Sequence, residues 1–450
     1  MEEAKGELRA PAVEIARHGA HEIHAIILAG GKGANLFPFT ESVPKCALPM
    51  VNRPLITYQL ELLRHCGIHD VHIVTFEDHL SALRQYERTS SGPHEPNVRV
   101  YGVPDHSGTA DAVRALRDYI TSDFLVLPCD LVADDVITEL VSVHRTRDAS
   151  LTVLLKEEEE GTDARGKPIK RPKDEVLDFT GVAEEDGRLV YLATSLEQED
   201  YITLTKPLLK RRARITLRQN ARDVHTYVFA RWVLDLLCEE PSMLSLRDDL
   251  VPYLLGRQFK GVEVLPTAIQ PLVAPLFAEA YSRSVAAPGS HPSGSEDAVR
   301  CHAVVLPASS EFCVRANTMP RFLAANLGLL AHRAPQGVLS PLARPEMTRA
   351  KGLKETVVGE ESELGGKVSL QRCVVGKRCK VGARSKLNGC ILMDGASVGE
   401  GCIIQNTIIG SDAVVGNRCN LNECQVTPGM VIEDGETRKG EAVGFTDALM

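Results

Sequence analysis

Aromatic residues are scarce in this sequence of 450 residues, where tryptophan, tyrosine and phenylalanine together make up 5%. No apolar run approaches the roughly eighteen residues that a membrane-spanning helix needs, and residues 1–22 are too charged for a signal peptide. No basic stripe marks a nucleic-acid binder either, since 60 acidic residues outnumber 51 basic ones. A basic segment at residues 206–218 could contact acidic partners or RNA, but it is more typical of a solvated face. We therefore expect a cytosolic protein with no membrane partner and no direct nucleic-acid partner.

The twelve cysteines include no Cys-x-x-Cys pair, and their distribution argues against disulfides and against a zinc site. Cys373, Cys390 and Cys424 are separated by multiples of the seventeen-residue repeat described below, so we expect small core residues that stack on one another. Three histidines within residues 18–24 have the pattern HxxHxxH, but they straddle the tail and the first expected strand, where no helix aligns them. We expect no metal ligands and no cofactor.

A glycine-rich string, LAGGKGANLFPFT at residues 28–40, places Gly30, Gly31 and Gly33 directly after an apolar run. Glycines at such positions let backbone N–H groups approach an anion with no Cβ in the way. Lys45 follows a dozen residues after the loop and could reach the same phosphates. A glycine loop alone is weakly specific, but together with the lysine it predicts a phosphate-binding loop.

Strand-like and helix-like segments alternate from residue 24 onward, and the strand-like segments are continuously apolar. The pattern favours an α/β fold with a mostly parallel, doubly wound (Rossmann-like) sheet covered on both faces. The expected strands are 24–30, 71–76, 98–103, 124–130 and 149–155, and the expected helices are 54–66, 109–120, 134–145 and 245–259. Ligands of such sheets bind beyond the carboxyl ends of the strands. Gly108 and Asp130 should therefore share one crevice with the glycine loop.

The C-terminal part of the sequence repeats every seventeen residues. Apolar residues recur at that spacing in three series: Val358, Val375, Leu392, Ile409 and Val426; Leu364, Val381, Val398, Val415 and Ile432; and Leu370, Leu387, Ile404 and Leu421. Steps of six, six and five residues describe three short strands per turn, which is the hexapeptide pattern of a left-handed parallel β-helix. A little over four turns are expected, or roughly 20 Å of stacked strands.

A β-helix of this kind has open strand edges and flat faces, which proteins usually cover by association. The pattern therefore implies a partner. Acyltransferases use the same prism with a histidine between neighbouring prisms, but this sequence has no histidine after His332. The acyltransferase alternative therefore fails.

The string LAGGKGANLFPFTESVPKCALPM, residues 28–50, resembles the signature of the nucleoside-diphosphate-sugar pyrophosphorylases, a nucleotidyltransferase family. The resemblance implies that the segment Gly108-Thr109-Ala110 faces the base and ribose of a nucleotide. It also implies that Asp130 holds the catalytic magnesium. Asp130 could equally be a strand-end carboxylate that is hydrogen-bonded to nearby amides.

Two departures from the family pattern oppose catalysis. Ala34 and Asn35 replace a Thr-Arg pair, which removes a permanently charged guanidinium from the triphosphate site. In the string RANTMPRFLAAN, Arg315 stands where the family carries a second metal-binding aspartate, and a cation there would repel magnesium. We therefore expect no catalytic residue and no bound metal. The expected vestigial nucleotide pocket consists of Gly30, Gly31, Gly33, Lys45, Gly108 and Asp130.

Over nearly all of the chain from Ile23 onward, the sequence resembles the gamma-subunit family of eukaryotic translation initiation factor 2B, for example at DHSGTADAVRAL, FLVLPCDL and SLRDDLVPYLLGRQF. The resemblance implies a nucleotidyltransferase-like domain, a left-handed β-helix and a noncatalytic, regulatory role. The implied partners are the paralogous epsilon subunit, the other subunits of the complex and initiation factor 2, on which the complex exchanges GDP for GTP. The epsilon subunit adds a C-terminal exchange domain, which we do not expect here because eighteen residues follow Ile432.

Two alternatives stay open. The chain could be an active sugar-nucleotide pyrophosphorylase, such as a mannose-1-phosphate guanylyltransferase, or a scaffold that binds nucleotide or sugar phosphate without turnover. The glycine loop and Lys45 support the pyrophosphorylase, whereas Asn35 and Arg315 oppose it. The expected organisation is a flexible tail at 1–22, a nucleotidyltransferase-like domain at 23–333 with mobile insertions near 156–175 and 282–298, a linker at 334–352, and the β-helix domain with a C-terminal tail at 353–450.

Overall fold

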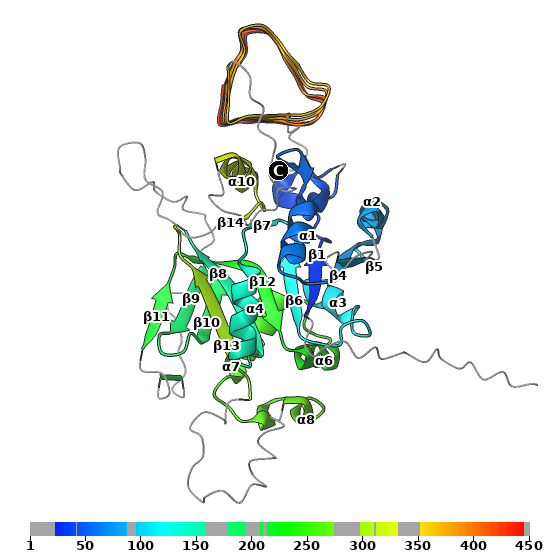
Figure 1. The fold of residues 1–450 in the computed structure, drawn as a ribbon, viewed down its shortest axis with the longest axis vertical. Coiled ribbons are helices and arrows are strands. Elements are labelled where there is room, and N and C mark those ends of the chain that lie inside the picture. The colour runs from blue at the N-terminus through cyan, green and yellow to red at the C-terminus, as the bar shows by residue number, and fades with distance from the viewer. Residues whose placement is uncertain are drawn as a thin grey trace, which may run out of the picture.

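Figure 1 presents a computed structural model of the chain, in which an α/β part lies next to a three-sided prism of strands. The structure describes residues 23–41, 43–87, 96–158, 178–194, 208–209, 214–273, 298–309, 312–331 and 352–444. The expected tail, the expected linker and most of the two expected insertions lie outside these described residues.

The α/β part is built on a seven-stranded sheet with the strand order β13-β8-β12-β6-β1-β4-β5. The strands are β1 (His24–Leu28), β4 (Asp70–Phe76), β5 (Asn97–Val103), β6 (Phe124–Pro128), β8 (Leu151–Glu157), β12 (Ala221–Phe229) and β13 (Cys301–Leu306). β12 runs antiparallel to β6 and β8, and the other neighbouring pairs are parallel. The prediction of a mostly parallel sheet is confirmed.

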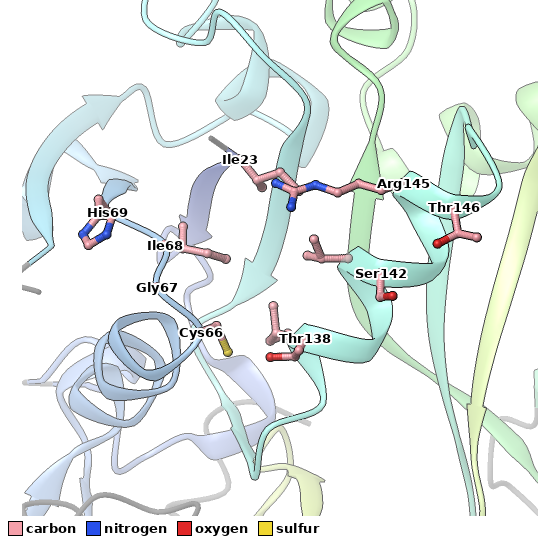
Figure 2. Close-up of a pocket in the computed structure, with 11 residues that line it drawn as sticks. Ile23, Cys66, Gly67, Ile68, His69, Thr138, Ser142, Arg145 and Thr146 are labelled. Atoms are coloured by element: carbon pink, nitrogen blue, oxygen red, sulfur yellow. The ribbon is translucent and has the colours of Figure 1, made fainter. Parts of the chain in front are cut away.

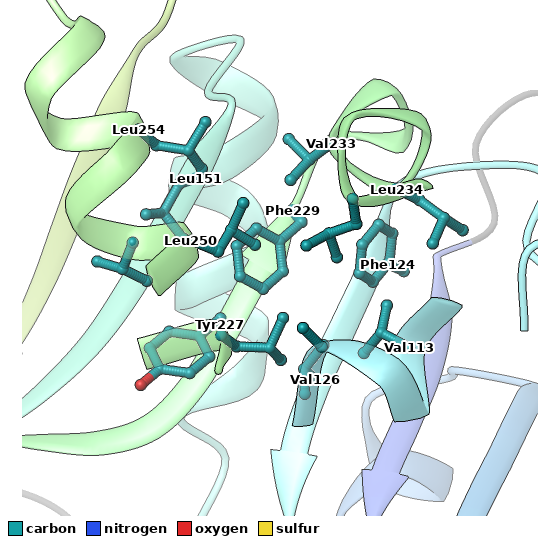
Figure 3. Packing of buried hydrophobic residues seen from close by; sticks show 14 of the residues in the cluster. Val113, Phe124, Val126, Leu151, Tyr227, Phe229, Val233, Leu234, Leu250 and Leu254 are labelled. Carbon is teal, nitrogen blue, oxygen red and sulfur yellow. The ribbon is translucent and has the colours of Figure 1, made fainter. Parts of the chain in front are cut away.

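Helices cover both faces of this sheet. Ile26 and Ile27 of β1 belong to two different buried clusters, and consecutive strand residues point to opposite faces. Figure 3 shows one cluster, where Phe124 and Phe229 of adjacent strands stack at 5.5 Å between ring centres. The helices are α1 (Leu55–His65), α2 (Leu80–Leu83), α3 (Thr109–Arg114), α4 (Ile137–Thr146), α6 (Arg231–Glu239), α7 (Val251–Arg257), α8 (Gln270–Val273) and α10 (Met319–Ala331). Among the described residues, none of the helices is both long enough and apolar enough to cross a membrane.

Two of the expected helices differ from the prediction in detail. The helix expected at 109–120 ends as α3 at Arg114, and the chain then tightens into turns in which the Leu116 N–H donates to the Val113 carbonyl. The helix expected at 245–259 opens with a wider turn, Leu246–Leu250, before α7. Its predicted cap is present, because the Ser245 hydroxyl accepts the N–H of Asp248 at 3.1 Å.

Some short strands were not predicted. A separate antiparallel sheet contains β9 (Asp178–Ala183), β10 (Leu189–Thr194) and β11 (Ile215–Arg218). The remaining short pairs are β2 (Pro49–Met50) with β3 (Arg53–Pro54), and β7 (Leu131–Ala133) with β14 (Cys313–Arg315). The β7–β14 pair lies beside Asp130.

The C-terminal prism has three parallel sheets, one on each side (Figure 1). The first side contains β15 (Leu353–Lys354), β18 (Ser369–Gln371), β21 (Lys386–Asn388), β24 (Ile403–Gln405), β27 (Asn420–Asn422) and β30 (Thr437–Lys439). The second side contains β16 (Val357–Val358), β19 (Val374–Val375), β22 (Ile391–Leu392), β25 (Ile408–Ile409), β28 (Gln425–Val426) and β31 (Ala442–Val443). The third side contains β17 (Glu363–Leu364), β20 (Lys380–Val381), β23 (Ser397–Val398), β26 (Val414–Val415) and β29 (Val431–Ile432).

The seventeen-residue register of the β-helix is confirmed. Val381 pairs with Val398 and Val398 with Val415, and all three side chains are buried in the prism. The strands continue beyond the predicted span, from Leu353 to Val443. The predicted stacking of cysteines is also confirmed, since Cys373, Cys390 and Cys424 are free thiols buried in this core.

The close stacking of turns explains the glycines that follow the strands. A Cβ atom on Gly382 would lie 2.5 Å from the carbonyl carbon of Gly399 on the next turn, which is too close for any side chain. At other corners the chain adopts the left-handed conformation, for instance at Gly395 with φ of 74° and Arg384 with φ of 62°.

The second side of the prism packs against the α/β part of the same chain. Its outward residues Val374 and Ile391 share a buried cluster with Phe322 and Leu329 of α10. The Asn52 side chain also donates a hydrogen bond to the carbonyl of Val375, at 2.7 Å. One of the three flat faces is therefore covered within the chain, which the sequence argument for a partner did not anticipate.

Candidate functional site

The predicted crevice residues meet at the carboxyl edge of the seven-stranded sheet. β1 and β6 pair in parallel, with Leu28 opposite Pro128. The glycine loop follows β1 and Asp130 follows β6, so both emerge from neighbouring strands at the same level. The Cys129 N–H donates to the Leu28 carbonyl at 3.2 Å and holds the two chain segments together.

The glycine loop keeps the conformation of an anion cradle. Gly33 has φ of 67°, and a Cβ there would lie 2.7 Å from the methyl group of Thr40, whose hydroxyl donates to the Gly33 carbonyl at 3.0 Å. A Cβ on Gly31 would meet open space. The N–H groups from Gly30 to Gly33 have no hydrogen-bond acceptor among the described residues. This backbone could still accept an anion.

Lys45 lies at the start of a short helical turn, η2 (Lys45–Ala47), beside the loop. Its Nζ is 2.5 Å from Oδ2 of Asp130, and the two side chains are 13% and 1% exposed. The lysine therefore lies beside Asp130, and its charge is paired with a carboxylate of the protein.

Arg315 completes the neutralisation of Asp130. The pairing of β14 with β7 places Arg315 opposite Leu131, the residue after Asp130. The guanidinium Nε is 3.1 Å from Oδ1 of Asp130, and Nη2 is 3.2 Å from Oδ2. Both carboxylate oxygens are thus bonded to cations, in a two-pronged geometry that suits arginine.

The electrostatics of this cluster favour the ionised carboxylate. Burial raises the pKa of Asp130, but the charges and hydrogen bonds of Arg315 and Lys45 outweigh it and hold the pKa well below its usual range. Burial also opposes the charge on Arg315, yet Asp130 raises the pKa of that guanidinium. The position that the family resemblance gives to magnesium is surrounded by protein cations, which do not fit a divalent metal ion.

Gly108 has a packing role that the sequence did not reveal. It precedes α3, and a Cβ there would lie 2.1 Å from the carbonyl oxygen of Leu244. That carbonyl accepts the N–H of Ala110 at 2.9 Å, while the Thr109 hydroxyl accepts the N–H of Leu246 at 2.9 Å. The start of α3 is therefore closed by residues 244–246. Asp105, in the turn between β5 and α3, lies 3.7 Å from Nζ of Lys32 in the glycine loop.

A second charged cluster next to Arg315 was missed by sequence reasoning. Arg247 contacts Asp178 and lies 3.0 Å from Asp223, whose Oδ2 also accepts the Tyr227 hydroxyl at 2.6 Å. Burial raises the pKa of Tyr227 well above its usual value, so this phenol stays a donor. The charge of Asp223 further favours the charged form of Arg315. No local signal joins these residues, because they come from β9, β12 and the turn before α7.

A pocket of about 240 Å³ opens beside these clusters, lined by residues that include Asp223, Cys313 and Arg315. At its rim Glu158 accepts from Arg222 at 2.6 Å and from Arg321 at 2.8 Å. Among the described residues, no group of three or more His, Cys, Asp or Glu side chains is arranged to hold a metal ion. In the part of the chain that the structure describes, the site therefore presents backbone N–H groups and paired ions.

Comparison with known proteins gives two matching family models. A model described as "Nucleotidyl transferase" matches residues 24–164, and one described as "EIF2B subunit epsilon LbH domain" matches residues 347–437. The chain is 31% identical over 261 residues to the translation initiation factor eIF2B subunit gamma of Dictyostelium discoideum, covering 54% of this chain and 59% of that protein. It is 27% identical over 317 residues to the same subunit of Schizosaccharomyces pombe, covering 68% and 65%.

The chain is similar to eIF2B gamma subunits over more than half of its length. It spans about 59–65% of the length of these two curated relatives. The resemblance to the gamma-subunit family is thereby confirmed, and the β-helix is of the left-handed type that the eIF2B epsilon model describes. A mannose-1-phosphate guanyltransferase of Schizosaccharomyces pombe is 31% identical over 144 residues, which cover 30% of this chain and 38% of that enzyme. That likeness is partial, whereas the likeness to eIF2B gamma subunits extends over more of the chain.

Proposed function

We propose that the chain is a noncatalytic, regulatory subunit of a guanine nucleotide exchange complex of the eIF2B type. In this role it pairs with a paralogous epsilon-type subunit and the other subunits, and helps the complex release GDP from initiation factor 2 in the cytosol. The similarity to eIF2B gamma subunits over more than half of the chain supports this proposal. The β-helix supports the paralogous pairing, because the family model that matches it describes epsilon subunits.

One observation carries the noncatalytic part of the proposal: Asp130 is enclosed by Lys45 and Arg315. Nucleotidyl transfer needs a cation beside the triphosphate, and Mg²⁺ usually binds through one or two carboxylates. Here the carboxylate is already neutralised by two side chains, and Asn35 supplies no charge in the loop. The domain would then serve as a scaffold on which the β-helix is mounted.

The test is to purify the chain, the epsilon-type paralogue and their co-expressed pair, and to follow the release of labelled GDP from initiation factor 2. The proposal predicts that the chain alone leaves the release rate unchanged, and that the pair releases GDP faster than the paralogue alone. Full exchange by the isolated chain would overturn the regulatory role. A chain that neither binds the paralogue nor changes its rate would overturn the partnership.

A sugar-nucleotide pyrophosphorylase is the second candidate, and the free N–H groups of the glycine loop favour it. A pyrophosphorylase would release pyrophosphate in a metal-dependent reaction. The assay of GDP release does not detect that reaction, so pyrophosphate must be measured separately. A scaffold that keeps only nucleotide binding would bind nucleoside triphosphate in a calorimetric titration and would release no pyrophosphate when sugar phosphate and Mg²⁺ are added.

A further inference from the structure

The first side of the β-helix prism presents flat rows of outward side chains. Leu370, Leu387 and Ile404 point into the core, so the residues on either side of each point outward. One outward row consists of amides that pair in register from strand to strand: Gln371, Asn388, Gln405 and Asn422. The second side differs, because its outward residues Val374 and Ile391 are covered by the α/β part. Within the part of the chain that the structure describes, the first side is therefore open to another molecule.

Positive charge gathers on the half of the first side that comes earlier in the chain. We define the basic face as residues 354–355, 367–372 and 384–388, which lie on β15, β18 and β21 and at the corners beside them. Its basic side chains are all exposed: Lys354, Lys367, Arg372, Arg384 and Lys386. Adjacent strands of a sheet are about 4.8 Å apart, so the three strands hold these cations within roughly 10 Å along the prism.

The basic face carries a net charge rather than a set of ion pairs. It contains five Lys or Arg residues and one acidic residue, Glu355, so its formal net charge is +4. Arg384 pairs at 3.2 Å with Glu400 of the next turn, which leaves a charge of +3 when that carboxylate is included. The side chains of the other four cations make no ion pair and no hydrogen bond with any described residue. Their charges are therefore available to a second molecule.

The surroundings of the basic face do not supply the missing counter-charge. Residues 332–351, which precede the prism, contain four Lys or Arg residues and one Glu. Several cations of the α/β part are paired instead, since Arg247 and Arg315 both contact aspartates. Arg145, which extends from α4 beside a pocket of about 460 Å³ (Figure 2), also has an interaction partner. The basic face thus stands out on a chain whose formal net charge is −9.

We propose that the basic face binds an acidic, extended segment of a partner protein. Carboxylates of the segment pair with the four unpaired cations. The amides Gln371 and Asn388 lie among these cations and can both donate and accept hydrogen bonds, so they suit the peptide groups of the same segment. This surface does not rest on the exchange role proposed above, and its test can fail without affecting that role.

Two features favour a protein over a nucleic acid as the partner of the basic face. Among the described residues of the first side, no outward residue has an aromatic ring on which a base could stack. A long polyanion would also be repelled by a chain whose formal net charge is −9, whereas a short acidic segment contacts the basic face alone.

The test measures the fluorescence anisotropy of three labelled probes with the full chain at low salt. The first probe is a dodecapeptide in which glutamate and serine alternate, the second has glutamine in place of glutamate, and the third is an oligouridine of the same length. We expect saturable binding of the glutamate peptide that added salt weakens, and no saturable binding of the glutamine peptide. The absence of saturable binding of the glutamate peptide up to millimolar concentration would overturn the proposal. Tighter binding of the oligouridine would also overturn it, because the face would then suit a nucleic acid.

A matched pair of arginines locates the binding. Arg372 on the basic face and Arg378 at the corner between the second and third sides are both exposed and unpaired among the described residues. Both have left-handed backbone, with φ of 49° and 54°, so glycine suits either position. Arg372→Gly should weaken binding of the glutamate peptide by about two- to fivefold, whereas Arg378→Gly should leave it unchanged. Equal effects of the two variants would contradict a site on the basic face.

A combined variant removes all four unpaired charges: Lys354→Gln, Lys367→Gly, Arg372→Gly and Lys386→Gln. It should weaken binding of the glutamate peptide by at least about tenfold. Thermal unfolding checks that the prism remains folded. If it does not, Lys354→Gln with Lys386→Gln, which alters only exposed strand residues, takes its place and should weaken binding by at least about fourfold. Unchanged binding in a folded variant of either kind would place the peptide elsewhere and overturn the proposal.

Discussion

The guanidinium of Arg315 lies against both carboxylate oxygens of Asp130, with Nε 3.1 Å from Oδ1 and Nη2 3.2 Å from Oδ2. Asp130 follows a strand of the parallel sheet, and Arg315 ends a short strand that pairs beside it. The fold thus brings the glycine loop and Asp130 to one edge of the sheet, while a cation of the protein neutralises the carboxylate that the family resemblance assigns to magnesium. We therefore expect structural roles in this chain for the residues at positions that serve catalysis in the pyrophosphorylases.

Replacing Arg315 by Ala should destabilise the α/β part, because Asp130 would then be buried with Lys45 as its single cation. Removal of one partner from a buried ion pair typically costs about 3–5 kcal/mol. The free energy of unfolding, measured with urea, gives the change. Arg384→Ala is the matched control, because Arg384 is 72% exposed in its pair with Glu400 and should cost less than about 1 kcal/mol. Equal, small losses in both variants would contradict a structural role for Arg315.

Acidification should destabilise the protein before its carboxylates titrate. Burial lowers the pKa of His72, His144 and His302 to about 4, whereas an unfolded histidine titrates near 6.5. The unfolded state therefore binds more protons between these values, and stability is lost as the pH falls from about 6.5 toward 4. Each histidine contributes up to about 1.4 kcal/mol per pH unit. Urea unfolding at several pH values measures the slope, and His72→Gln should reduce it. A flat profile from pH 7 to 5 would contradict the burial of neutral histidines.

Val398→Asp should destabilise the β-helix by several kcal/mol, because it places an unpaired charge in a dry stack. Val398 is 2% exposed. Val414 lies in the next turn on the same side of the prism, but its side chain points outward and is 41% exposed. Val414→Asp is therefore the control and should change stability by less than about 0.5 kcal/mol. Thermal unfolding compares the two variants. If Val398→Asp unfolds at the same temperature as the unmodified chain, the inward register is wrong.

Ile391→Asp should separate the β-helix from the α/β part without unfolding either. Ile391 points outward from the second side and is 2% exposed, because the α/β part covers it. Ile403 points outward from the uncovered first side and is 45% exposed, so Ile403→Asp is the control. Small-angle scattering should show a larger radius of gyration for Ile391→Asp than for the control. Identical scattering profiles would contradict a contact that depends on this apolar row.

The repetitive part of the fold was the most predictable from sequence, because each turn of the β-helix makes the same contacts as the next. A period of seventeen residues is therefore sufficient to assign Val398 and Ile404 to the core. The docking of the second side was not predicted, although Val374 and Ile391 are apolar at outward positions, which is a usable signal. The strand β1 and its glycine loop were also predictable, since an apolar strand and its following turn are local in sequence.

The contacts that define the candidate site were only partly predictable. Lys45 and Asp130 are 85 positions apart in the sequence. Only the pattern of a parallel sheet predicted that they would lie close together. The cluster of Asp178, Asp223 and Arg247 depends on the folding of separate strands against each other, for which the sequence carries no periodic signal. Gly108 was assigned to a nucleotide pocket, but the approach of the Leu244 carbonyl gives a packing reason for glycine there. The close approach of two backbones is not encoded in a local pattern.

The release of pyrophosphate shows directly whether the nucleotidyltransferase-like domain is catalytic. The purified chain would be incubated with GTP, mannose 1-phosphate and Mg²⁺, and pyrophosphate would be measured over time. Because Arg315 and Lys45 neutralise Asp130 and no arginine stands at position 35, we expect no release above the background without protein. Magnesium-dependent turnover in the ordinary enzyme range, about 1 to 1,000 per second, that is lost in Asp130→Asn would contradict it.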